Sequence, residues 1–129
     1  MKLEIPRNAI VPQVIEVEDG KTSTFDPFSG LLKDRVIVVE SEVNTAMASS
    51  VVAQLLLLEK DPHAEITMYI NSPGGSVMDG LAIADTMEFI SCDVRTVGLG
   101  MQASMGSFLL ASGTPGKRHM LRRSQIMIH

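Results

Sequence analysis

The chain has very few aromatic residues and a single cysteine. None of its 129 residues is tryptophan, and aromatic residues amount to 4%. Cys92 alone cannot form an intrachain disulfide, which indicates a reducing compartment and excludes a disulfide-stabilised scaffold. Because no cationic residue or conspicuous histidine motif flanks Cys92 in the sequence, we expect an inert thiol rather than a nucleophile.

Long apolar runs and an excess of positive charge are also missing. No run of 18 apolar residues occurs, and residues 1–7 have no apolar signal-peptide core, so we expect a cytoplasmic protein without a membrane partner. The net charge of −4 argues against a nucleic-acid partner, because such proteins neutralise phosphates. The basic run at residues 117–123 has no interleaved aromatic residues and is interpreted as a solvated hairpin flank.

Motifs for metals and nucleotides are not evident. No pair of histidine, cysteine or carboxylate residues has metal-ligand spacing. The glycine-rich turn at residues 71–76 has neither the Lys-Ser/Thr ending of a phosphate-binding loop nor the spacing of a dinucleotide-binding turn. We therefore expect no cofactor and no metal in this chain.

The length and the hydrophobic periodicity favour one α/β domain. Residues 1–30 are rich in proline and glycine and are interpreted as an N-terminal arm or loop, with the domain following over residues 31–129. Short β-branched runs alternate with segments of helical period in that domain. The expected strands are residues 35–39, 66–70, 93–99, 117–121 and 125–128, and the expected helices are residues 44–59, 76–90 and 105–111.

Two glycine-rich turns, residues 71–76 and 100–106, each follow a strand and precede a helix. Active sites of α/β proteins form outside the carboxyl ends of strands, so both turns could face one site. Ser104 stands where a sharp strand-to-helix turn would expose a nucleophile, although small residues at such positions are usually helix caps. The N–H of Met105 and that of Gly75 could then bind one negative oxygen.

A histidine is the base that such a serine requires. His129 follows the apolar residues 126–128, which would hold its ring at the end of a strand. His63 and His119 lie among loop and basic residues and are interpreted as structural or surface residues.

Several strings, in this order, resemble the proteolytic subunit of the Clp protease, a serine peptidase family. The resemblance covers nearly all of the chain after the first ten residues. The strings are Leu31-Leu32-Lys33-Asp34-Arg35-Val36-Ile37, Ala53-Gln54-Leu55-Leu56-Leu57-Leu58-Glu59, Tyr69-Ile70-Asn71-Ser72-Pro73-Gly74-Gly75-Ser76, Asp85-Thr86-Met87-Glu88-Phe89-Ile90, Gly100-Met101-Gln102-Ala103-Ser104-Met105-Gly106, Gly116-Lys117-Arg118 and Met127-Ile128-His129.

The resemblance implies a crotonase-like fold of repeated ββα units and a serine endopeptidase. Ser104 would be the nucleophile, His129 the general base, and the N–H groups of Gly75 and Met105 the oxyanion hole. The chemistry would be peptide-bond hydrolysis through an acyl-enzyme, with no cofactor in this subunit.

The resemblance also implies partners. The family forms two stacked seven-membered rings, and an AAA+ unfoldase such as ClpX, ClpA or ClpC delivers unfolded polypeptides and uses the ATP. The unfoldase would dock in apolar pockets, although each lining residue could equally belong to an ordinary core. The matching positions are Leu56, Leu57, Tyr69, Phe89, Val97 and Leu99.

Two departures from the family pattern affect this interpretation. His119 replaces a usual aromatic residue near the docking pocket, and Arg122-Arg123 replaces a usual Pro-Asn pair. The triad aspartate and the long handle helix of the family come after the histidine, so we expect a fragment of a longer protein. A catalytically silent or truncated ring subunit and, more distantly, a crotonase-like acyl-CoA enzyme are the alternatives.

Overall fold

A computed structural model describes residues 13–129, and the chain divides into two compact units, Met1–Asp34 and Arg35–His129. Part of the expected N-terminal arm, residues 1–12, lies outside the described residues. Among the residues described, no helix is both long and apolar enough to cross a membrane.

The first unit contains a β-hairpin and a short helix. Strands β1 (Val14–Glu18) and β2 (Lys21–Phe25) pair antiparallel across Asp19–Gly20, where φ is +51° and +75°. This two-residue turn matches the twist of the strands. Helix α1 (Pro27–Lys33) follows, and the Oδ1 of its capping residue Asp26 accepts the N–H of Ser29 at 3.0 Å. The segment interpreted as an arm or loop thus contains regular structure, and its strands are mostly exposed.

The second unit is built on a five-stranded parallel sheet. Its order is β3 (Val36–Glu40), β4 (Ile66–Ser72), β5 (Val94–Ala103) and β6 (Arg118–Met120), and β7 (Gln125–Met127) also pairs with β5. The expected strands are confirmed, but β5 continues beyond residue 99 to Ala103. The extension exists because β7 pairs with the last residues of β5, a contact that periodicity alone does not reveal.

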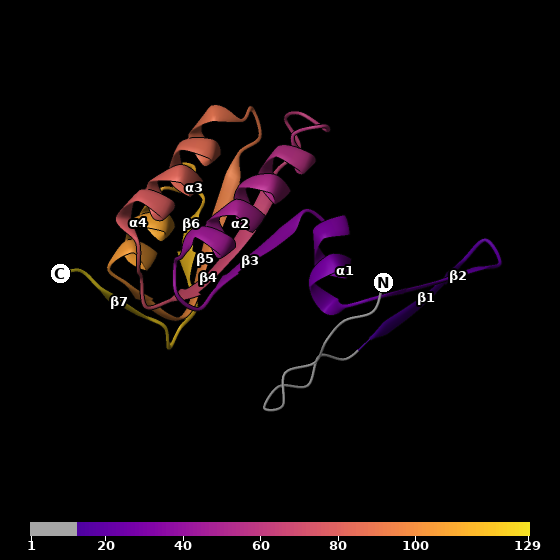
Figure 1. The fold of residues 1–129 in the computed structure, drawn as a ribbon, viewed down its shortest axis with the longest axis horizontal. Coiled ribbons are helices and arrows are strands. Elements are labelled where there is room, and N and C mark those ends of the chain that lie inside the picture. The colour runs from indigo at the N-terminus through magenta and orange to yellow at the C-terminus, as the bar shows by residue number, and fades with distance from the viewer. Residues whose placement is uncertain (1–12) are drawn as a thin grey trace. The chain divides into compact units, whose positions relative to one another are not determined.

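Three helices cover one face of this sheet. They are α2 (Thr45–Leu58), α3 (Val77–Phe89) and α4 (Met105–Ala111), and Figure 1 shows them together beside the strands. Strands β3, β4 and β5 lie in chain order, so right-handed crossovers place successive helices on the same side. Side chains cap two of these helices, with Asn44 accepting from Met47 and Ser76 accepting from Asp79.

The core lies between the helices and the sheet. Alternate residues of β4, such as Ile66, Met68 and Ile70, are fully buried, whereas Thr67 and Tyr69 between them are only half-buried. Within the second unit, helices cover one face of the sheet and none covers the other, which we call the open face. The parallel strands and their crossovers also place both glycine-rich turns at one edge, where the candidate site lies.

Candidate active site

Ser104 lies between the end of β5 and the start of α4 with a rare backbone conformation. Its φ and ψ are +54° and −120°, values that side-chain-bearing residues seldom adopt. Although Ser104 occupies the N-cap position of α4, its side chain makes no capping hydrogen bond. The interpretation of this serine as an ordinary helix cap is therefore excluded.

Hydrogen bonds hold the backbone on both sides of Ser104. Its N–H donates to the carbonyl of Met127 on β7 at 2.8 Å. Its carbonyl accepts the N–H of Ser107 at 3.0 Å, the N–H of Phe108 at 3.2 Å and the Oγ of Ser107 at 2.6 Å. A positive φ at a non-glycine residue costs on the order of 1–3 kcal/mol, and these contacts maintain it.

The second glycine-rich turn packs directly on this strained residue. A Cβ added to Gly74 would lie 2.8 Å from the Cβ of Ser104 and 3.0 Å from the nitrogen of Met105. Gly75 has a φ of +150°, and a Cβ there would lie 2.2 Å from the carbonyl oxygen of Val43. Only glycine fits at either position: the missing side chain of Gly74 permits the close approach of the two turns, and that of Gly75 permits the approach to Val43.

The two expected oxyanion donors thus belong to segments in contact. Met105 is the first residue of α4, where an N–H has no partner within the helix. Gly75 is exposed at the edge of the sheet. Gly106 continues the close packing, because a Cβ there would lie 2.6 Å from the carbonyl oxygen of Ser72.

His129 and Ser104 line the same cavity. Strand β7 pairs Met127 with Ala103, which brings the residues after it alongside the start of α4. The cavity has a volume of about 310 Å³. Its lining consists of Ser104, Ser107, Phe108, Ala111, Ile128 and His129.

The sequence model of the Clp protease family matches residues 19–129. The chain belongs to the Clp protease family. The matched segment contains both glycine-rich turns, Ser104 and His129, and the mixed α/β architecture with a mostly parallel sheet agrees with the ClpP-type fold. Membership confirms the resemblance found in the sequence and supports a ClpP-like protease.

The residues expected at the family's docking pocket fall into two groups. Tyr69, Val97 and Leu99 share the open face of the sheet, and Tyr69 and Val97 are neighbours in the β4–β5 register. Leu56, Leu57 and Phe89 belong instead to the helix layer, where the exposed fraction of Phe89 is 83%. The structure therefore does not bring all six into one pocket within this chain.

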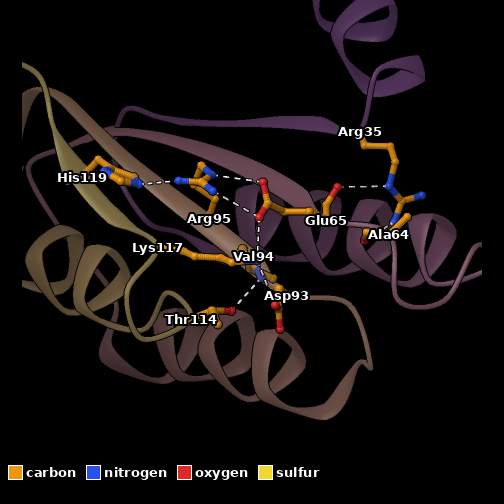
Figure 2. A network of polar contacts seen from close by, with 9 residues as sticks. All are labelled: Arg35, Ala64, Glu65, Asp93, Val94, Arg95, Thr114, Lys117 and His119. Carbon is orange, nitrogen blue, oxygen red and sulfur yellow. Dashed lines mark hydrogen bonds and ion pairs between the residues drawn. The ribbon is translucent and has the colours of Figure 1, made fainter.

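A charged network borders the open face, with His119 at one end (Figure 2). Hydrogen bonds from Arg95 and then Lys117 lower the pKa of Glu65 from 4.5 to about 2. Lys117 also contacts Asp93 at 3.0 Å. The Nε2 of His119 contacts the guanidinium of Arg95.

Cys92 has a different environment from the one expected. Its thiol contacts the guanidinium of Arg35 at 3.4 Å, a cation that the sequence neighbours of Cys92 did not reveal. Burial, followed by the hydrogen bond with Glu59, nevertheless raises the pKa of this thiol. The raised pKa keeps Cys92 in the unreactive thiol form.

Sequence reasoning missed one polar residue beneath the site. Gln102 is fully buried two residues before Ser104, and its amide contacts strand β4. The signal that could have drawn attention to it is Gly98, whose missing side chain makes room for that amide. Within residues 13–129, no three histidine, cysteine or acidic side chains gather where they could hold a metal ion.

Proposed function

We propose that this chain is the serine endopeptidase subunit of a Clp-type protease. The observation that carries the proposal is the arrangement at Ser104, whose hydroxyl is not used as a cap and which lines one cavity together with His129. The Gly74–Gly75 turn packs against the same residue. Family membership supplies the chemistry that this arrangement would perform.

In this mechanism His129 removes the proton of the Ser104 hydroxyl as its oxygen attacks the carbonyl carbon of a peptide bond. The N–H groups of Gly75 and Met105 bind the oxygen that becomes negative. His129 then returns the proton to the departing amine, which leaves an ester on Ser104. Water, activated by the same imidazole, hydrolyses that ester and restores the serine.

Unfolded polypeptides are the proposed substrates. Phe108, Ala111 and Ile128 give the cavity beside Ser104 an apolar lining that would hold an apolar side chain. By analogy with its family, the subunit would work in the cytoplasm in a homo-oligomer of two stacked seven-membered rings. An AAA+ unfoldase that hydrolyses ATP would deliver the chains, docking through the two apolar groups described above.

Hydrolysis by matched serine variants tests this proposal. The purified chain should cleave a fluorogenic peptide with an apolar residue before the scissile bond. Ser104→Ala should remove about 10³-fold or more of that activity. Ser112→Ala is the control, because Ser112 lies at the far end of α4 and its Oγ donates to the carbonyl of Phe108.

Equal activity of Ser104→Ala and wild type would refute the assignment of the nucleophile. A folded wild-type chain that cleaves no peptide would instead favour a catalytically silent ring subunit.

A further inference from the structure

The strand that carries Ser104 contains an irregularity where it passes β4. Ile70 pairs with Gly98, but the next pair is Ser72 with Gln102. One residue of β4 therefore faces the three residues 99–101 of β5. Bulges of this kind interrupt the ladder and bend a strand, and they are common next to active sites.

Two side-chain amides form hydrogen bonds with backbone groups at this bulge. The Nε2 of Gln102 donates to the carbonyl of Ile70 at 2.8 Å and to that of Leu99 at 2.7 Å. The Oδ1 of Asn71 accepts the N–H of Met101 at 3.1 Å. The bond from Gln102 to the carbonyl of Ile70 joins β5 to β4 immediately before the segments that carry Ser104 and Gly74.

The orientation and the position of the Gln102 amide are fixed. Two carbonyl oxygens face its nitrogen, so the reversed amide would place oxygen against oxygen. The side chain is fully buried, and a Cβ on Gly98 would lie 2.4 Å from its Oε1. No side-chain or backbone donor among residues 13–129 reaches that Oε1.

We propose that Gln102 is a positioning residue. It sets the distance between Ser104, at the junction of β5 and α4, and the Gly74–Gly75 turn. It does so by joining the carbonyls of β4 and β5 across the bulge. The inference rests on the proposed role of Ser104, and it goes further by assigning the geometry of that site to one buried amide.

Gln102→Met tests the inference, because methionine keeps the length of the side chain and removes its donors. The readout is the rate at which a fluorophosphonate labels Ser104 in fully folded protein. We expect a loss of about 10- to 100-fold, since small misplacements of reacting groups have effects of this size. Hydrogen exchange in residues 71–77 and 99–106 should become faster in the same variant.

Thr96→Val is the matched control. Thr96 is also fully buried on β5, and its hydroxyl donates to the carbonyl of Leu110 at 2.8 Å, away from the bulge. Its replacement should lower stability but leave labelling within twofold of wild type. Faster exchange should appear near residues 108–114 and not in residues 71–77.

Gln102→Glu adds a readout that a packing role would not affect. An ionised carboxylate faces the two carbonyl oxygens unfavourably, whereas a protonated carboxyl can donate to one of them. Burial favours the protonated form. The labelling rate of this variant, divided by that of wild type at the same pH, should therefore rise as the pH falls from about 8 to 6.

The inference is overturned if Gln102→Met matches Thr96→Val in labelling and in exchange of residues 71–77. A pH-independent ratio for Gln102→Glu would count equally against it. If wild type is not labelled at all, the proposed nucleophile fails, and the exchange comparison alone decides whether Gln102 holds the two turns together.

Discussion

At the scale of single residues, the backbone conformation of Ser104 is the feature that distinguishes it from an ordinary helix cap. A serine that capped α4 would adopt an extended conformation and would use its hydroxyl to accept a helix N–H. Ser104 instead has a φ of +54°, and its main chain is bonded to Met127 and Ser107. The strain therefore coincides with a hydroxyl that is not used for local structure, as expected at a functional position.

This strain predicts an unusual stability for Ser104→Gly. Glycine adopts the observed φ and ψ freely, whereas alanine keeps the Cβ that causes the strain. We expect Ser104→Gly to be more stable than Ser104→Ala by about 1 kcal/mol in urea unfolding. This figure is the strain relieved less the additional conformational entropy that glycine loses on folding.

The same pair of substitutions at Ser107, an interior position of α4, serves as the control. There the order should be reversed, with glycine less stable than alanine by about 1 kcal/mol. If Ser104→Gly were the less stable of the two Ser104 variants, the conformation described for this residue would be wrong.

At the scale of elements, Arg35 fixes the end of α2 and the loop that leads to β4. The guanidinium is planar, presents five donors and remains charged, so it can bind several carbonyl oxygens at once. Its side chain is only 20% exposed. The carbonyls that it contacts, at 2.9 to 3.3 Å, are those of Leu58, Asp61, Ala64 and Glu65.

Arg35→Met should therefore destabilise the fold by about 2–3 kcal/mol, because it leaves several carbonyls without their charged donor. Arg118→Met is the control, since Arg118 is exposed and, among residues 13–129, its side chain donates only to the carbonyl of Ala111. Its cost should be below about 1 kcal/mol in the same chemical unfolding experiment. Equal costs for the two variants would contradict the role given to Arg35.

The elements that the sequence predicted correctly are those with local signals. Helix α2 begins after the cap Asn44, α3 begins after Ser76, and α4 has the expected bounds, 105–111. The hairpin at residues 14–25 was missed because its strands are exposed and lack a buried alternating face. The last part of β5 was missed because it depends on pairing with the distant β7.

At the scale of the whole molecule, charge pairs join segments that are far apart in the sequence. Glu65 precedes β4, Arg95 lies in β5, and Lys117 precedes β6, so the network ties together the starts of three strands (Figure 2). Because Arg95 and Lys117 lower the pKa of Glu65 to about 2, its ionised form favours the folded state.

The sign of this linkage predicts a pH dependence. The stabilisation from Glu65 is complete above about pH 4.5 and disappears as the pH falls toward 2. Glu65→Gln should lower the free energy of unfolding at pH 7 by up to about 1 kcal/mol, since the group is partly exposed and screened. Its stability curve should approach that of wild type near pH 2.

Glu88→Gln, at an exposed position outside this network, is the control for the pH series and should follow wild type throughout. A constant difference between Glu65→Gln and wild type from pH 7 to pH 2 would contradict the linkage.

The candidate site could be predicted from sequence only in part. The two glycine-rich turns, Ser104 and His129 carry recognisable residue types, and parallel topology explains why the turns share one edge. The contacts of Gln102 could not be predicted, because they depend on the register of β4 against β5. The division of the docking residues between two faces likewise follows from the arrangement of the layers.

The central claim is that Ser104 is a nucleophile activated within this fold. The most direct measurement is covalent labelling of the folded chain with a fluorophosphonate, read by intact mass and by peptide mapping. The account predicts one adduct per chain, located on Ser104 and absent from Ser104→Ala. An adduct on another serine, or none on folded wild-type protein, would contradict it.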